Sequence, residues 1–131
     1  MSAGPDAFAG KRLLIVDDET SLLVPMQRYF ERLGCTVATA TSRAAAARLL
    51  ETLTFDLVIL DIVLAEDERG GLDVLAEARR RLPGLPVLVL SGLVSAEIED
   101  EVARLGARRV LIKPQPLREL ARVATELMSG A

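Results

Sequence analysis

Short apolar runs alternate with longer segments in which apolar residues recur at helical spacing, from about residue 12 to residue 128. The runs are rich in Leu, Ile and Val and predict strands at Arg12–Val16, Thr36–Thr39, Leu57–Leu60, Val87–Leu90 and Val110–Ile112. Their almost continuous hydrophobicity is typical of strands that are buried on both faces. The alternation with helical segments therefore favours an α/β fold in which crossover helices join parallel strands.

The helical spacing predicts five helices, at Ser21–Leu33, Ser42–Thr52, Leu72–Leu82, Ala96–Leu105 and Pro116–Met128. Gly34 directly follows the first of them and is a natural helix end. Ser42 and Ser95 are typical N-caps. Pro25 lies inside the first segment, where proline is tolerated only near the first turn. Pro116 suits the first turn of the last helix.

The length of 131 residues and the hydrophobic content of 50% fit one domain with its own core. We expect residues 11–131 to form this domain and residues 1–10 to form a flexible leader, which lacks the basic start and the apolar stretch of a signal peptide. No apolar run approaches the roughly 20 residues that cross a bilayer. We therefore expect a cytoplasmic protein without membrane insertion.

The composition excludes several kinds of chemistry. The chain has no histidine, which excludes histidine-based triads, histidine metal sites and a role as phosphohistidine donor. Its single cysteine, Cys35, excludes an internal disulfide and is interpreted as a small core residue. The net charge of −3 gives no reason to expect direct nucleic-acid binding. The basic run Arg79–Arg81 is interpreted as a solvated helix end. Carboxylate, hydroxyl and lysine chemistry remain.

Polar residues follow four of the predicted strands. Asp17 and Asp18 follow the first strand and Asp61 follows the third. Ser91 follows the fourth strand and Lys113 follows the fifth. The carboxyl ends of parallel strands meet at one edge of a sheet, and ligands bind there, where the strand order reverses. We therefore expect these side chains to form one site.

The expected site suits a cation and a phosphoryl group. Two carboxylates ~4 Å apart repel by ~4 kcal/mol at an effective dielectric constant near 20. Oxygen ligands without histidine or thiolate favour a hard cation, and an incomplete cage favours Mg²⁺ over Ca²⁺. Lys113 and Ser91 can both donate hydrogen bonds to phosphoryl oxygens. A carboxylate nucleophile, a metal and fixed donors are what phosphoryl transfer requires.

Four segments resemble, in order and spacing, the receiver domain of two-component response regulators. LLIVDDE (Leu13–Glu19) is similar to the first strand with its acidic pair, and FDLVILDIVL (Phe55–Leu64) to the phosphoacceptor strand. PVLVLSG (Pro86–Gly92) is similar to the strand with the switch hydroxyl, and GARRVLIKP (Gly106–Pro114) to the lysine–proline end. The resemblance covers about residues 11 to 128. It implies a flavodoxin-like (βα)5 fold with a five-stranded parallel sheet of order 2-1-3-4-5.

The resemblance also implies the roles of the site residues. Asp61 would accept phosphate from a sensor histidine kinase or a phosphotransfer protein and so switch the binding of a downstream protein. Ser91 would turn towards the phosphoryl group and Lys113 would pair with it. The domain would catalyse only its own phosphorylation and dephosphorylation, so we do not expect an enzyme.

For the metal, the resemblance implies that Asp18 and Asp61 ligate Mg²⁺ directly, together with the backbone carbonyl of Val63. Asp17 would act mainly through a water molecule. The family usually has a cis peptide bond before the proline, which we therefore expect between Lys113 and Pro114.

Three departures from the family pattern concern output rather than chemistry. Val110 stands where the family usually has Tyr or Phe, and Gln115 where Phe is common. The segment after Asp61 has Ala65 in place of the common proline, and it is about two residues longer, with the acidic run 66–68. We expect these changes to affect signal output, partner choice or phosphate lifetime.

Several alternatives remain open at this point. The chain could be a receiver module of a hybrid kinase or a larger regulator, or a scaffold that works without phosphate. A phosphatase with an aspartyl-phosphate intermediate is disfavoured, because such enzymes usually carry an acid two residues after the nucleophile and this chain has Val63 there. The sequence does not identify the cognate kinase, the signal, the downstream partner or the oligomeric state.

Overall fold

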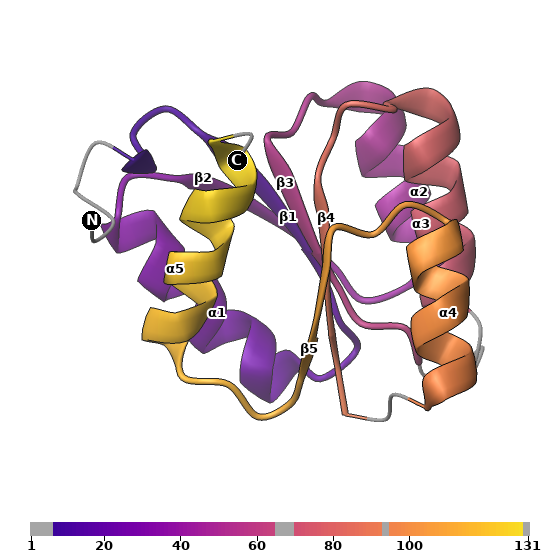
Figure 1. The fold of residues 1–131 in the computed structure, drawn as a ribbon. Helices are drawn as coiled ribbons and strands as arrows, with labels where there is room; N and C mark the ends of the chain where they lie inside the picture. The colour runs from indigo at the N-terminus through magenta and orange to yellow at the C-terminus, as the bar shows by residue number, and fades with distance from the viewer. Residues whose placement is uncertain (1–6, 65–69, 93–94, 130–131) are drawn as a thin grey trace.

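The computed structural model describes residues 7–64, 70–92 and 95–129. Strands and helices alternate along these residues (Figure 1). The strands are β1 (Arg12–Val16), β2 (Thr36–Ala40), β3 (Leu57–Leu60), β4 (Val87–Ser91) and β5 (Arg109–Ile112). The helices are α1 (Thr20–Arg32), α2 (Arg43–Thr52), α3 (Gly70–Arg81), α4 (Ala96–Arg104) and α5 (Leu117–Met128). All ten predicted elements are confirmed; β1 and β3 have the predicted bounds, and the ends of the others differ from the prediction by at most two residues.

The strands form one parallel sheet in the order β2-β1-β3-β4-β5, which confirms the predicted flavodoxin-like topology. From β1 the chain moves to one side of the sheet to form β2, and it then crosses to the other side of β1 to form β3. The strand order therefore reverses between β1 and β3. All strands run in the same direction, so their carboxyl ends lie at one edge, the lower edge in Figure 1.

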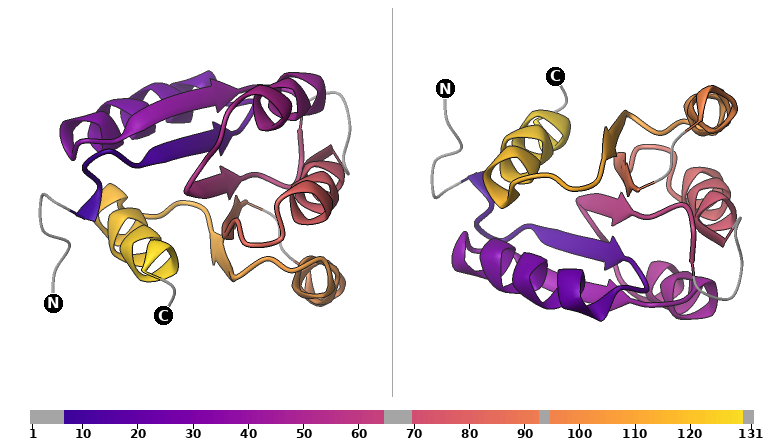
Figure 2. Two further views of the ribbon diagram at one scale, coloured as in Figure 1. Left: turned by 90° about the horizontal axis from the view of Figure 1, so that it is seen from above. Right: turned by 90° about the horizontal axis from the view of Figure 1, so that it is seen from below.

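Alternate strand residues point to opposite faces of the sheet and build two separate cores. Leu13 and Ile15 of β1 belong to the core beneath α1 and α5, whereas Leu14 and Val16 belong to the core beneath α2, α3 and α4. Figures 1 and 2 show the resulting three layers, with α1 and α5 on one face of the sheet and α2, α3 and α4 on the other. Burial on both faces explains why the strands lack the alternation of a half-exposed sheet.

The structure describes residues 7–10 of the expected flexible leader, and there it shows packing on the domain. Phe8 is fully buried in the core beneath α1 and α5, with its ring 5.6 Å from the ring of Phe30. Residues 1–6 lie outside the described residues. The burial of one aromatic ring holds residues 7–10 on the domain. An isolated Phe gives no periodic pattern, so the sequence did not reveal this packing.

The helix ends follow the predicted signals. Gly34 has φ +106° and ends α1, where its N–H donates to the Glu31 carbonyl and the N–H of Cys35 donates to the Phe30 carbonyl. These two bonds form a Schellman motif, in which glycine avoids strain. The hydroxyl oxygens of Ser42 and Ser95 accept hydrogen bonds at the starts of α2 and α4, as predicted.

The two helix prolines differ slightly from the prediction. Pro25 is the sixth residue of α1, beyond its first turn, and is exposed. Pro116 is the N-cap of α5 and not its first helical residue. Both positions suit proline: an N-cap needs no helical hydrogen bond from its amide, and the solvent face of α1 tolerates the missing one at Pro25.

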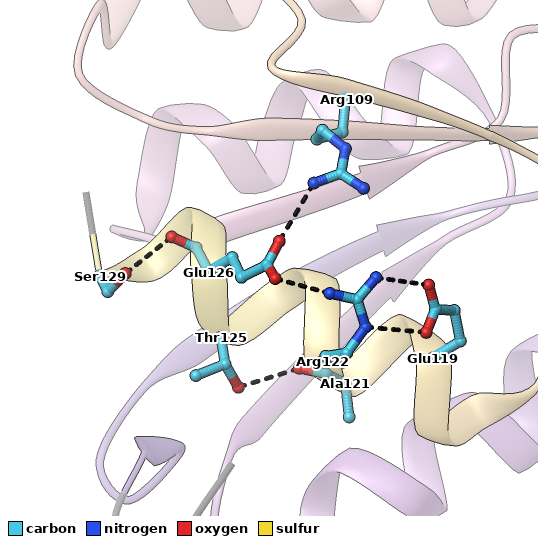
Figure 3. A network of polar contacts seen from close by, with 7 residues as sticks. All are labelled: Arg109, Glu119, Ala121, Arg122, Thr125, Glu126 and Ser129. Carbon is cyan, nitrogen blue, oxygen red and sulfur yellow. Dashed lines mark hydrogen bonds and ion pairs between the residues drawn. The ribbon is translucent and has the colours of Figure 1, made fainter. Parts of the chain in front are cut away.

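A network of charged residues ties α5 to the edge strand β5 (Figure 3). The guanidinium of Arg122 contacts both Glu119 and Glu126, and Glu126 also accepts a hydrogen bond from Arg109 of β5 at 3.1 Å. The hydrogen bonds from Arg122 lower the pKa of Glu119. All members are largely exposed, so we expect each pair to contribute little to stability by itself.

Candidate functional site

The topology places the predicted site residues at the carboxyl edge of the sheet. Asp17, Asp61 and Lys113 each directly follow a strand, and Ser91 is the last residue of β4. An open cavity of about 500 Å³ lies there, lined by Asp18, Glu19, Asp61, Val63, Ser91, Gly92 and Lys113. Every sequence-predicted site residue except Asp17 lines this cavity, and Asp17 is linked to it through Lys113.

Asp61 is the centre of the site. It is only 6% exposed. Its Oδ1 accepts a hydrogen bond of 2.8 Å from the hydroxyl of Ser91 and one of 3.3 Å from the N–H of Val63. Its Oδ2 lies 3.0 Å from the ammonium of Lys113. Both oxygens are therefore held by donors from neighbouring strand ends, which fixes the orientation of the carboxylate.

Lys113 is shared among three carboxylates. Its Nζ lies 2.7 Å from Asp17, 3.0 Å from Asp61 and 3.3 Å from Glu19. Burial by itself would lower the pKa of Lys113, but hydrogen bonds and attraction from Asp17 and Asp61 outweigh burial and raise the pKa above its ordinary value. The ammonium therefore stays charged, and it compensates one of three neighbouring negative charges.

Asp17 makes the shortest of the three ion pairs of Lys113. It is only 3% exposed, and burial raises its pKa, an effect that the hydrogen bonds from Lys113 and from the backbone N–H of Glu19 partly offset. The bond to Glu19 is a local turn that Asp readily forms at the start of a helix. The same turn directs the chain from β1 into α1.

Glu19 is a member of the site that sequence reasoning missed. Its carboxylate is 55% exposed and contacts Lys113, and it groups with Asp17 and Asp61 so that one oxygen of each lies within 4.8 Å of the others. Asp18 lines the same cavity but does not belong to this group. The sequence feature that could have indicated this role is the position of Glu19, directly after Asp17 and Asp18.

The donor set fits a hard divalent cation. It consists of carboxylates around a single ammonium, with no histidine and no thiol, and it opens to solvent. Such oxygen ligands, with room for water, suit Mg²⁺. A divalent ion would also remove the remaining repulsion among the acids. The structure thus supports a cation site at this edge.

Gly71 allows α3 to approach the end of β3 closely. A Cβ added at this position would lie 2.1 Å from the carbonyl oxygen of Asp61 and 2.4 Å from the Cα of Ile62. The N–H of Gly71 also donates to the carbonyl of Ile62 at 2.9 Å. Glycine is therefore needed to seat α3 beside the residue on which the site is centred.

The departures noted in the sequence have different outcomes. Val110 is half-buried and packs against the core beneath α2, α3 and α4. The side-chain amide of Gln115 donates to the carbonyl of Ile112 at 2.8 Å. The peptide bond between Lys113 and Pro114 is cis, as expected. Ala65 and the acidic run 66–68 lie outside the described residues.

Comparisons with known proteins agree with this geometry. Residues 13–125 match the family model described as response regulator receiver domain. The alginate biosynthesis transcriptional regulatory protein AlgB of Pseudomonas putida is 39% identical over 103 residues, which are 79% of this chain and 22% of that protein. The chain spans less than a third of the length of the curated relatives it matches.

Two solved structures have the same fold. A receiver domain protein (CheY-like) from Methanospirillum hungatei has a TM-score of 0.88 and 29% identity, covering 92% of this chain and 94% of that one. A response regulator from Burkholderia pseudomallei, with a phosphorylated aspartic acid, a calcium ion and citrate, has a TM-score of 0.80 and 27% identity over 92% of this chain and 72% of that one. Among the described residues, none of the helices combines the length and hydropathy needed to cross a membrane.

Proposed function

Because this chain belongs to the response regulator receiver family, we propose that Asp61 is the residue that accepts the phosphoryl group. The observation that carries this assignment is the environment of its carboxylate. Asp61 is buried at the strand-order reversal, with Ser91 and Lys113 on its two oxygens. Receiver domains take phosphate from histidine kinases or phosphotransfer proteins, and a phosphohistidine of such a partner is the proposed donor.

In the proposed reaction a carboxylate oxygen of Asp61 attacks phosphorus, a P–O bond forms, and the P–N bond to the donor histidine breaks. The bonding electron pair leaves with the imidazole nitrogen. Lys113 and Ser91 already donate to Asp61, so a small movement lets them donate to phosphoryl oxygens instead. Fixed donors of this kind stabilise the charge on the transferred group.

Receiver domains generally bind Mg²⁺ at an acidic pocket, and the donor set here fits that ion. We propose Asp18, Asp61 and the Val63 carbonyl as direct ligands and Asp17 as a ligand through water. When bound, Mg²⁺ supplies a double positive charge that neutralises developing charge on the phosphoryl oxygens. Glu19 lies close enough to the group to contribute a carboxylate as well.

Phosphorylation adds about −1.5 to −2 charge beside Lys113. We expect Ser91 and α4 to shift between two packings in response, and so to change the surface that a downstream partner contacts. Val110 has no aromatic ring that could report this shift, so the half-buried contact of Val110 is expected to change little. Slower amide exchange in α4 after phosphorylation supports the switch, and unchanged exchange there contradicts it.

Receiver domains are generally phosphoacceptors without an enzymatic activity of their own, and we propose that this one catalyses only its own phosphorylation and dephosphorylation. The acceptor role places it in the cytoplasm, where a kinase domain can reach it. It belongs to a two-component phosphorelay, either by itself or as a module of a hybrid kinase or a larger regulator. The runner-up function is a scaffold that binds partners without phosphate.

One experiment separates these functions. The chain is incubated with Mg²⁺ and acetyl phosphate, and its intact mass is measured. The wild type should gain one phosphoryl group, Asp61→Asn should gain none, and Asp100→Asn, an exposed aspartate on α4, should gain one like the wild type. No gain in the wild type favours the scaffold, and a gain in Asp61→Asn refutes the assignment of Asp61.

A further inference from the structure

A second cavity lies at the opposite edge of the sheet, where the strands begin. It has a volume of about 570 Å³ and runs beneath the amino ends of four strands. Lys11 precedes β1, Asp56 precedes β3, Pro86 precedes β4 and Arg108 precedes β5, and all four line it. The cavity is separate from the site of Asp61, because the whole length of the sheet lies between them.

The charges at the two ends of this cavity lack partners. Neither the ammonium of Lys11 nor the guanidinium of Arg108 has an ion pair or hydrogen bond within the described part of the chain. Arg81 also lines the cavity, but it is already paired with Glu77 and Glu51. Within the described residues, two unpaired cations therefore line this one cavity. They favour an anionic partner.

The carboxylate of Asp56 also lines this cavity, and it accepts a hydrogen bond from the backbone. Its Oδ2 accepts a hydrogen bond of 2.9 Å from the backbone N–H of Arg12. Phe55, Leu127 and Met128 contribute apolar side chains to the lining of the cavity. Phe55 and Met128 remain half-exposed, so they offer apolar surface that a partner can cover.

The spacing of the cations sets the length of the partner. β1 and β5 are separated by β3 and β4, so three strand spacings of ~4.8 Å place Lys11 and Arg108 about 14 Å apart along the edge. An extended peptide rises about 3.3 Å per residue. Two acidic residues four positions apart therefore span about 13 Å, and because side chains alternate along an extended chain, the residue midway between them faces the same surface.

We propose that the amino edge of the sheet is a second docking surface, which binds an extended acidic peptide segment. Two carboxylates of the segment pair with Lys11 and Arg108, and the apolar side chain midway between them covers the surface of Phe55 and Met128. The surface is independent of the phosphoacceptor site, so a receiver that docks a partner here keeps Asp61 accessible to its kinase.

The test uses the acetylated and amidated peptide Glu-Ala-Leu-Leu-Glu, titrated into the ¹⁵N-labelled chain. We expect chemical-shift changes at residues 11, 55, 108 and 128 with millimolar affinity, and little change around Asp61. The double variant Lys11→Gln/Arg108→Gln should bind about tenfold more weakly, because both charge pairs are lost. Arg118→Gln, an exposed cation at the far end of α5, should bind within about twofold of the wild type.

Three outcomes overturn the proposal. The first is equal binding by the double variant while its spectrum shows a folded protein. The second is equal binding of the neutral peptide Gln-Ala-Leu-Leu-Gln. The third is the same set of shifts with inorganic phosphate alone, which reduces the surface to a general anion site. Asp61→Asn should bind the peptide like the wild type, so failure of this proposal and failure of the phosphoacceptor assignment are distinguishable.

Discussion

The two edges of the sheet are built from the same strands but have opposite chemistry. At the carboxyl edge, Asp17, Glu19 and Asp61 surround the single ammonium of Lys113, and the group is connected by short contacts. At the amino edge, Lys11 and Arg108 line an open cavity and have no side-chain partner among the residues that the structure describes. The carboxyl edge is therefore a coupled and largely buried site, whereas the amino edge is an open surface.

This difference shows that burial, more than residue type, decides how strongly a polar residue at a strand end affects the molecule. A charge that is removed from water depends on its partners, and the loss of one partner leaves the others uncompensated. An exposed charge is solvated with or without a partner. Chemically equal substitutions at the two edges should therefore have unequal effects, which can be measured with matched pairs of residues.

The two lysines should give the largest difference. Lys113→Met leaves the buried carboxylates of Asp17 and Asp61 without their cation, and we expect a loss of about 3–5 kcal/mol in the free energy of unfolding in EDTA. Lys11→Met removes a cation that has no partner among the described residues, and it should change the free energy of unfolding by about 0.5 kcal/mol or less. Urea unfolding of both variants measures the difference.

The same variants connect this stability to the cation site. Mg²⁺ can replace the positive charge that Lys113→Met removes, so Mg²⁺ should restore more stability to this variant than it adds to Lys11→Met. If Mg²⁺ stabilises both variants equally, the acidic group does not bind the ion in the way proposed. If the two variants are equally stable in EDTA, the contrast between the edges is wrong.

The two glycines test backbone packing at each edge. Gly71→Ala places a Cβ 2.1 Å from a backbone oxygen, which cannot move aside as a flexible side chain can. We expect a loss of roughly 3 kcal/mol in the free energy of unfolding, at the upper end of overpacking effects. Gly84→Ala meets no atom within 4 Å and should be neutral or stabilise by about 0.4–1 kcal/mol. A thermal-unfolding midpoint for Gly71→Ala equal to that of the wild type would contradict the close approach of α3.

Two serines make hydrogen bonds of equal length and unequal burial. The hydroxyl of Ser91 donates to Asp61 at 2.8 Å inside the site, and that of Ser129 donates to the carbonyl of Glu126 at 2.8 Å in solvent. Ser91→Ala should cost about 1–3 kcal/mol, because the buried Asp61 loses a donor. Ser129→Ala should lower the free energy of unfolding by ~0.3 kcal/mol. Equal losses in urea unfolding would show that burial is not the deciding factor.

The sequence predicted the carboxyl edge better than the amino edge for a physical reason. Asp17, Asp61 and Lys113 directly follow apolar runs, and a parallel sheet brings such positions together whatever the loops do. Both N-cap serines were readable from their places before the helical segments, whereas the order of the strands was implied by the resemblance to receiver domains. The cavity beside Lys11 depends instead on where α5 ends and how Phe55 packs. No local sequence pattern predicts either of these features.

The errors of the prediction have similar causes. Phe8 was assigned to a flexible leader, because one buried ring in an otherwise polar segment has no period. The role of Glu19 was missed, because an exposed glutamate at a helix start resembles a solvated residue. Both residues act through contacts with elements far away in the sequence, so only the folded chain reveals them.

Cys35 offers the smallest and most local test, because it lies at the amino edge, directly before β2, where the charge of Asp56 acts on it. Burial first and the charge of Asp56 second raise the pKa of the Cys35 thiol from 9.0 to about 11. The thiol therefore stays protonated in neutral solution, and its stabilisation is complete below about pH 9 and lost as the pH rises towards 11.

Alkylation of the native chain by iodoacetamide should accordingly be at least roughly a hundredfold slower at pH 8 than that of the urea-unfolded chain, because the thiolate is the reactive form. The native rate should keep rising with pH above 9 instead of levelling there. Asp56→Asn removes the smaller of the two causes, so it should raise the native rate at pH 8 slightly, whereas Asp73→Asn on α3 should not. Levelling of the wild-type rate near pH 9 would mean that burial does not raise the pKa of the thiol, which contradicts the role given to burial at this edge. An equal rise in both variants would mean that Asp56 has no specific effect on Cys35.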